Sequence, residues 1–143
     1  MKALTLILMI PLISLNLNAQ TLDLEGRTIV KDFPFCNDEV VFNMTEDLTV
    51  KTWDREGIRF MIEVKLTSHR YELIKELLVL GRYQIELEKD GTRCSFSMPE
   101  LRKQVTINGL ALEELIHITV FIPEGASNYL FPKGQIAYMW NAE

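Results

Sequence analysis

The sequence predicts a mainly β domain: a two-layer antiparallel β-sandwich or β-roll built from hairpins, with one short α-helix near residues 70–80. Three turn signals that join strands of alternating apolar and polar residues indicate the hairpins. A hydrophobic content of 48% is enough for a packed core. Hairpins with one apolar face need a second layer to cover it, which favours a sandwich or roll. An up-and-down β-barrel is the alternative.

The first segment is typical of a secretory signal peptide. Lys2 precedes an apolar run, and the small residue Ala19 stands before the expected cleavage site. The run is too short for a membrane span, which needs about 20 apolar residues. We therefore expect a signal peptide at residues 1–19 and a single β-rich domain at residues 20–143. The domain would be exported, and either periplasmic or on the cell surface.

The composition of the exported part argues against two classes of partner. Removing residues 1–19 takes away Lys2 alone among the charged residues, which leaves 14 basic against 20 acidic residues and a net charge of −6. Nucleic acids and anionic lipids attract clustered Lys and Arg. Gln20 stands where a lipid-anchored protein would carry Cys, and no later segment is long enough to span a membrane. We expect no nucleic-acid partner and no integral membrane span.

The first strands are expected at residues 27–33 and 40–44. A hairpin follows, with Gly57 in the left-handed region of a turn that begins at Asp54. In this register Val50 lies opposite Ile62, and the apolar residues of both strands share one face.

The helix is expected from Arg70 to Leu80, with Ser68 as its N-cap and Gly81 as its left-handed stop. Four apolar residues at helical spacing would pack one side of it on a sheet. They are Tyr71, Ile74, Leu77 and Leu78.

The second hairpin is predicted at Asp90-Gly91, which places Leu87 opposite Cys94 and points Cys94 into the core. Cys36 is the other cysteine. An even number of cysteines in an oxidising compartment favours a disulfide between them, worth roughly 4 kcal/mol in the chain-entropy model. Two separately buried thiols are the alternative.

The third hairpin is predicted at Asn108-Gly109, with Ile107 opposite Leu110. The outgoing strand is apolar at alternate positions through Ile122, but Glu114 breaks this pattern on the core face. We expect a bulge or kink there. A last strand is expected at residues 135–140, and the connection at residues 127–129 has no clear assignment.

No residue pattern in the chain predicts a catalytic or metal site. His69 is expected at the helix start, and His117 on the solvent side of its strand. Neighbouring acidic residues, such as Glu113 and Glu114, point to opposite faces of a strand and do not converge. The sequence lacks zinc and calcium motifs and a nucleophile elbow. We expect no enzyme activity and no cofactor.

An aromatic cluster near the C-terminus has two interpretations. Tyr138 and Trp140 could form an interaction face, because aromatic residues are enriched at interface centres. Aromatic residues in a late strand also commonly belong to the core, and we favour the core here.

The middle of the chain resembles a family of uncharacterised envelope proteins of Gram-negative bacteria. The members of this family are exported, rich in β-strands and adhesin-like. The resemblance covers about residues 47–125 and rests on short segments. These are Leu48 to Asp54, Gly81-Arg82-Tyr83, Met98 to Gly109 and Val120 to Gly125. The family implies a β-roll or β-solenoid and no catalytic residues. This chain departs from it by being short, poor in glycine and equipped with a helix.

The function expected from these observations is a non-enzymatic exported envelope protein with a structural or adhesive role. Its partner would be another envelope protein or a surface component, contacted through a sheet edge or face. The alternative is a carrier of a small apolar ligand held inside a barrel or between the layers.

Overall fold

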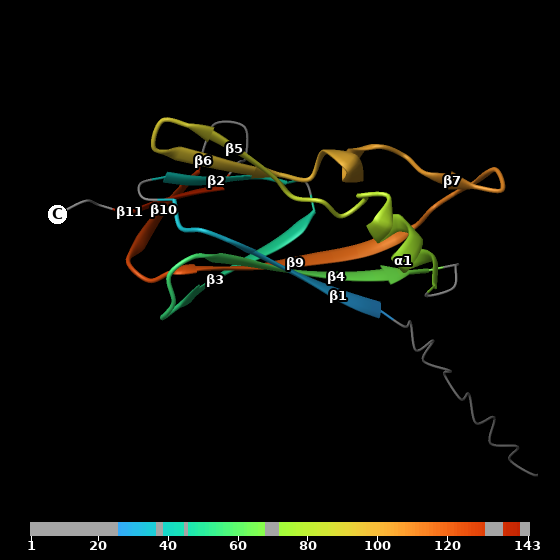
Figure 1. Cartoon of the computed structure of the whole chain (residues 1–143), viewed down its shortest axis with the longest axis horizontal. Helices are drawn as coiled ribbons and strands as arrows, with labels where there is room; N and C mark the ends of the chain where they lie inside the picture. The colour runs from blue at the N-terminus through green and yellow to red at the C-terminus, as the bar shows by residue number, and fades with distance from the viewer. Residues whose placement is uncertain (1–25, 37–38, 45, 68–71, 131–135, 141–143) are drawn as a thin grey trace, which may run out of the picture.

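A computed structural model shows two β-sheets stacked face to face, with the hydrophobic core between them (Figure 1). It describes residues 26–36, 39–44, 46–67, 72–130 and 136–140. The predicted signal peptide, His69 and Ser68 lie outside these residues.

The first sheet has four strands in the order β1-β4-β9-β3. Their bounds are β1 Gly26–Phe33, β3 Asp47–Trp53, β4 Ile58–Leu66 and β9 Glu114–Pro123. Strand β4 pairs antiparallel with both β1 and β9, whereas β3 pairs parallel with β9. Strands β1 and β3 are therefore the edges of this sheet.

The second sheet has five strands in the order β10-β11-β2-β6-β5. Their bounds are β2 Glu39–Asn43, β5 Glu86–Asp90, β6 Arg93–Ser97, β10 Ala126–Leu130 and β11 Ile136–Trp140. Strands β2 and β6 pair parallel, and the other neighbours pair antiparallel.

Three smaller elements lie toward one end of the sandwich (Figure 1). They are helix α1 (Glu72–Val79), the 3-10 turn η1 (Pro99–Arg102) and the hairpin of β7 (Thr106–Ile107) with β8 (Leu110–Ala111). Helix α1 lies between β4 and β5 in the chain.

The predicted fold class is confirmed, because the described chain is mainly β, forms two stacked layers and has one short helix near residues 70–80. Both sheets end in edge strands within the described residues, so they form an open sandwich rather than the alternative up-and-down barrel. The two parallel pairs were not expected from hairpin signals alone.

The predicted hairpin between residues 48–54 and 58–64 is wrong. Strand β9 lies between these two strands, so Val50 pairs with Val120 and Ile62 pairs with Ile118. Gly57 does adopt a positive φ of 98°, but the turn belongs to a wide connection that passes the end of β9. Strand β9 can take this place because its apolar side chains lie on the same face of the sheet as those of β3 and β4 and extend one buried surface.

The second hairpin forms, but its register differs by two residues from the prediction. Asp90 pairs with Arg93, and Leu87 pairs with Phe96 instead of Cys94. Gly91, with a φ of 61°, takes the first central position of the turn, as in type II′, rather than the second. A shift of two residues keeps every side chain on its predicted face, and Cys94 is buried as expected.

The third hairpin is confirmed. Ile107 pairs with Leu110, and Asn108 and Gly109 both have positive φ angles, as a type I′ turn requires. No bulge occurs at Glu114, which pairs in regular register with Leu66. The predicted continuous strand is instead interrupted just before Glu114, because β8 ends at Ala111 and β9 begins at Glu114. The Glu114 carboxylate is accommodated by ionic and hydrogen-bonding partners.

Helix α1 ends as predicted. The Gly81 N–H donates to the Leu78 carbonyl (3.1 Å) and the Arg82 N–H donates to the Leu77 carbonyl (2.9 Å). With Gly81 at a φ of 80°, these bonds form a Schellman motif. Ile74 and Leu77 are buried, which confirms this part of the apolar stripe, whereas Tyr71 lies outside the described residues.

The core between the layers is filled by aromatic rings. Phe60 of the first sheet packs against Phe42 and Phe96 of the second, with ring centroids 5.8 and 5.1 Å apart. Such contacts add about 0.5–1.5 kcal/mol per pair to the burial of apolar area. A disulfide joins Cys36 and Cys94 beside this cluster and closes a loop with a sequence separation of 58. The centre of the sandwich is therefore occupied by packed apolar side chains.

Candidate functional site

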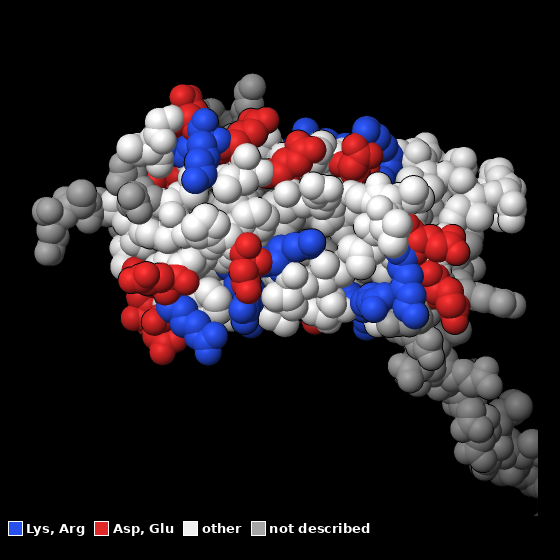
Figure 2. Space-filling view, viewed as in Figure 1, with Lys and Arg blue, Asp and Glu red and all other residues white. Residues whose placement is uncertain are grey.

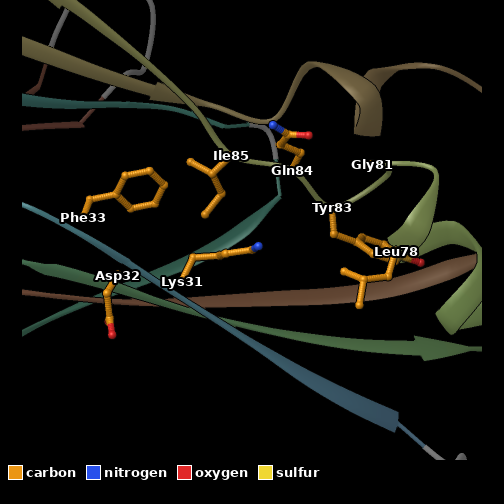
Figure 3. A pocket seen from close by; sticks show the side chains of 8 residues that line it. All are labelled: Lys31, Asp32, Phe33, Leu78, Gly81, Tyr83, Gln84 and Ile85. Carbon is orange, nitrogen blue, oxygen red and sulfur yellow. The ribbon is translucent and has the colours of Figure 1, made fainter.

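A groove of about 380 Å³ opens between the two layers at the edge strand β1 (Figure 3). The end of β1 lines one side, and the connection from α1 to β5 lines the other. The lining residues are Lys31, Asp32, Phe33, Leu78, Gly81, Tyr83, Gln84 and Ile85.

Local structure brings these side chains together. In β1, alternate residues face the second layer, so Ile29, Lys31 and Phe33 share the inner face. Ile29 is buried and Phe33 packs against the core, whereas Lys31 is exposed. On the opposite side, the Schellman turn at Gly81 redirects the chain and lets Tyr83 become fully buried. The groove thus has an apolar floor and one inward-facing cation.

A polar cluster holds the Tyr83 side of the groove in place. Arg82 Nη2 donates to Glu114 Oε2 (2.7 Å), and the Tyr83 hydroxyl donates to Glu114 Oε1 (2.7 Å). Arg82 Nη1 also donates to the carbonyl oxygens of Glu100 and Lys103. One arginine therefore connects the end of α1, the turn η1 and the start of β9, which fixes the floor of the groove.

The buried position of Tyr83 raises its pKa well above the ordinary value, mainly by desolvation and further through its hydrogen bond to the Glu114 carboxylate. Tyr83 therefore remains a neutral hydrogen-bond donor. We assign it a structural role, because its hydroxyl is already engaged by Glu114.

The rim of the groove carries charges of both signs, and among the described lining residues Lys31 is the cation that points inward. Asp32 accepts two hydrogen bonds from Arg59, at 2.6 and 2.8 Å. Arg59 thereby lowers the pKa of Asp32 and neutralises its charge. Figure 3 shows the Lys31 side chain extending into the groove and the Asp32 side chain pointing the other way. Among the described residues, no carboxylate forms an ion pair with Lys31.

A smaller hollow of about 240 Å³ adjoins the groove and shares Asp32 and Phe33 with it. Its wall includes Trp53, whose ring lies 5.2 Å from the Arg59 guanidinium carbon and 5.7 Å from that of Arg55. The end of β1 is therefore hollowed on two sides. Aromatic and arginine side chains gather there, and these residue types are enriched at interfaces.

The groove lies beside an open sheet edge. Strand β1 pairs with β4 on one side, and no described strand pairs with its other side. An edge strand leaves alternate N–H and C=O groups available to a further strand. The groove and this edge together can accept an extended polypeptide, with backbone hydrogen bonds on β1 and side chains between the layers.

The residues that the sequence suggested as an interaction face lie elsewhere. Tyr138 packs on Phe42 with ring centroids 5.8 Å apart, and Trp140 packs on Phe35 at 4.8 Å. Both are partly buried against the core. Burial also raises the pKa of Tyr138. The structure does not bring these two rings into the groove.

The remaining chemical candidates do not converge on the groove. His117 lies on the outer face of β9, where its Nδ1 contacts Asp47 Oδ2 at 2.8 Å. Its side chain is 37% exposed, and it lies on the solvent side of its strand, where the sequence predicted it. Within the described stretches, no group of three His, Cys, Asp or Glu residues could hold a metal ion.

The visible surface mixes charges of both signs. Basic and acidic side chains are interspersed on the face seen in Figure 2, and no continuous basic band crosses it. None of the helices described is long and apolar enough to cross a membrane. The expectation that nucleic acids do not bind stays a prediction.

Comparison of the chain with protein-family models, with curated proteins and with solved structures finds no match. The resemblance to adhesin-like envelope proteins therefore stays a prediction.

Sequence reasoning missed the groove, although one signal was present. Lys31 stands between Ile29 and Phe33 on the inner face of a predicted strand. A charge at such a position marks a sheet edge or a binding site, because a paired inner face would bury it.

Proposed function

We propose that this chain is an exported, non-enzymatic envelope protein with a structural or adhesive role, and that it binds an extended segment of another envelope protein along β1. The observation that carries the proposal is the open edge of β1 beside the groove at Lys31. The signal-peptide pattern of residues 1–19 supports export.

The surroundings of the groove favour binding over catalysis. Glu114 and Tyr83, the ionisable groups beneath its floor, are engaged with each other, and Glu114 also pairs with Arg82. His117 pairs with Asp47 on the outer face of the sheet. These groups are engaged with one another in their present positions, and none is arranged as a nucleophile next to a free base.

A second candidate, the carrier of a small apolar ligand, is favoured by one observation. The groove volume of about 380 Å³ lies within the range of small-molecule sites. Native mass spectrometry of the purified protein would detect a bound lipid or metabolite. A single apo mass would remove this candidate.

Site-specific photo-crosslinking in the producing cells tests the main proposal. A photoreactive amino acid replaces Val30, which is 49% exposed on β1. The matched control replaces Lys51 on β3, the opposite edge of the same sheet. We expect one defined protein adduct from position 30 and none, or a different one, from position 51. The same adducts from both positions, or no adduct from position 30, would contradict binding at β1.

A further inference from the structure

Lys31 is an inward-facing charge on an edge strand. Its neighbours on the same face, Ile29 and Phe33, belong to the core or pack against it. Proteins place inward-facing lysines on sheet edges to prevent indiscriminate strand pairing. A strand added to β1 would remove water from the Lys31 ammonium, and this desolvation is unfavourable unless the new strand supplies a partner of opposite charge. Lys31 can therefore discriminate among strands.

The charge that would satisfy Lys31 does not come from the described part of the chain. No carboxylate there forms an ion pair with it. The neighbouring Asp32 points away from the groove and is held by Arg59 at 2.6 Å (Figure 3). The charge presented inside the groove is therefore positive and is complementary to a carboxylate.

The floor beside Lys31 suits an apolar side chain. Phe33 and Ile85 lie on one side of the Lys31 side chain, and Leu78 and Tyr83 lie on the other (Figure 3). On a strand, side chains that share a face are two residues apart. A strand that places a carboxylate near Lys31 thus places its next inward side chain over one of these apolar pairs.

We propose that the groove recognises an extended peptide segment that carries a carboxylate and an apolar side chain two residues apart, and that Lys31 selects the carboxylate. This inference rests on the proposed function, because it specifies the chemistry of the partner segment at β1. A strand without the carboxylate would bury the ammonium unpaired, so Lys31 both excludes the wrong strands and attracts the right one.

Peptide titration tests the inference with the secreted protein as its producing cells process it. The probe is a terminally blocked nine-residue peptide with the sequence Thr-Val-Thr-Glu-Thr-Leu-Thr-Val-Thr. One matched peptide has glutamine for the glutamate, and a second has serine for the leucine. NMR amide shifts of the ¹⁵N-labelled protein give both the affinity and the location of binding.

We expect the glutamate peptide to shift the amides of β1 and to bind about fivefold more tightly than the glutamine peptide, as for a partly exposed ion pair. The serine peptide should also bind more weakly. Lys31→Met should remove the preference for glutamate, and Lys31→Glu should reverse it toward a peptide with lysine in that place. Lys51→Met on the other edge should keep the preference.

Three outcomes would overturn the inference. They are the absence of β1 shifts with all peptides, equal affinity for the glutamate and glutamine peptides, and an unchanged preference in Lys31→Met. If a crosslink from position 30 persists in any of these cases, the partner chemistry is wrong while the proposed binding at β1 stands. Loss of both the crosslink and the peptide shifts would remove the proposed function itself.

Discussion

Two arginine–carboxylate pairs in this protein meet at nearly equal distances in opposite surroundings. Arg82 and Glu114 meet at 2.7 Å, with side chains 9% and 6% exposed. Arg59 and Asp32 meet at 2.6 Å, with side chains 33% and 59% exposed. The first pair lies beneath the groove, and the second lies at its rim.

The difference shows how solvent decides what an ion pair does. The interaction of an exposed pair is screened by water and salt, so it contributes little to stability. A buried pair has lost its hydration, and removal of one partner leaves an uncompensated charge in the core. We infer that Arg82 and Glu114 maintain the fold around the groove, whereas Arg59 and Asp32 adjust the charge that the groove presents.

The largest effect is expected from Arg82→Met. It leaves the Glu114 carboxylate buried without its cation and should lower the free energy of unfolding by about 3–5 kcal/mol. Urea denaturation measures the change. The double variant Arg82→Met with Glu114→Leu, which removes both charges, should recover most of the loss. A cost below about 1 kcal/mol for the single variant would show that water reaches this pair.

A smaller loss is expected from Tyr83→Phe, which removes one hydrogen bond to a charged group and should cost about 1.5–3 kcal/mol. The raised pKa of Tyr83 adds a pH dependence. The contribution of the neutral Tyr83 hydroxyl to stability is complete below the pKa that tyrosine has in the unfolded chain, near 10. It is lost as the pH rises toward the higher pKa of Tyr83 in the folded protein. Stability should therefore fall at alkaline pH, and less steeply in Tyr83→Phe. Tyr138→Phe is the comparison variant: burial alone raises the pKa of that residue, so its removal should also make the alkaline loss less steep.

The exposed pair should affect binding more than stability. Arg59→Gln frees the Asp32 carboxylate beside Lys31, so the affinity for the glutamate peptide should fall about twofold to threefold. The thermal unfolding midpoint should change little. Glu63→Gln is the control, because Glu63 lies on the same outer sheet face as Arg59, and it should leave the affinity for the peptide unchanged. A large loss of stability with unchanged peptide affinity would reverse the assignment of the two pairs.

The smallest effect is the one that Asp32→Asn should have on stability at acidic pH. Hydrogen bonding to Arg59 lowers the pKa of Asp32, so the contribution of this pair is present above the unfolded pKa and is lost as the pH falls through the folded pKa, below 3.8. Asp32→Asn should remove only a slight part of the acid-induced loss of stability. Denaturation curves between pH 2 and 6 would reveal it, and a major change in the acid limb would contradict the exposed character of the pair.

Sequence reasoning predicted the local features of the fold and failed on several long-range ones. The Schellman end at Gly81 and the type I′ turn at Asn108 depend on backbone conformations that few residues adopt, so their sequence signals are specific. The neighbours of β3 and β4 were mispredicted because apolar alternation specifies a face and not a partner. The groove was missed because its two walls are separated in the chain and meet only when the layers stack.

The sequence by itself determined which side of the strands in the predicted hairpins is buried, where α1 ends and where two of the turns form. These properties depend on a repeat of two residues or on the φ angle of single residues. The tertiary structure alone decided that β9 separates β3 from β4, that Glu114 is accommodated by Arg82 and Tyr83, and that β1 remains an open edge beside Lys31. Each of these depends on which of several equally apolar surfaces pack together, and this choice is made by the whole core rather than by any one segment.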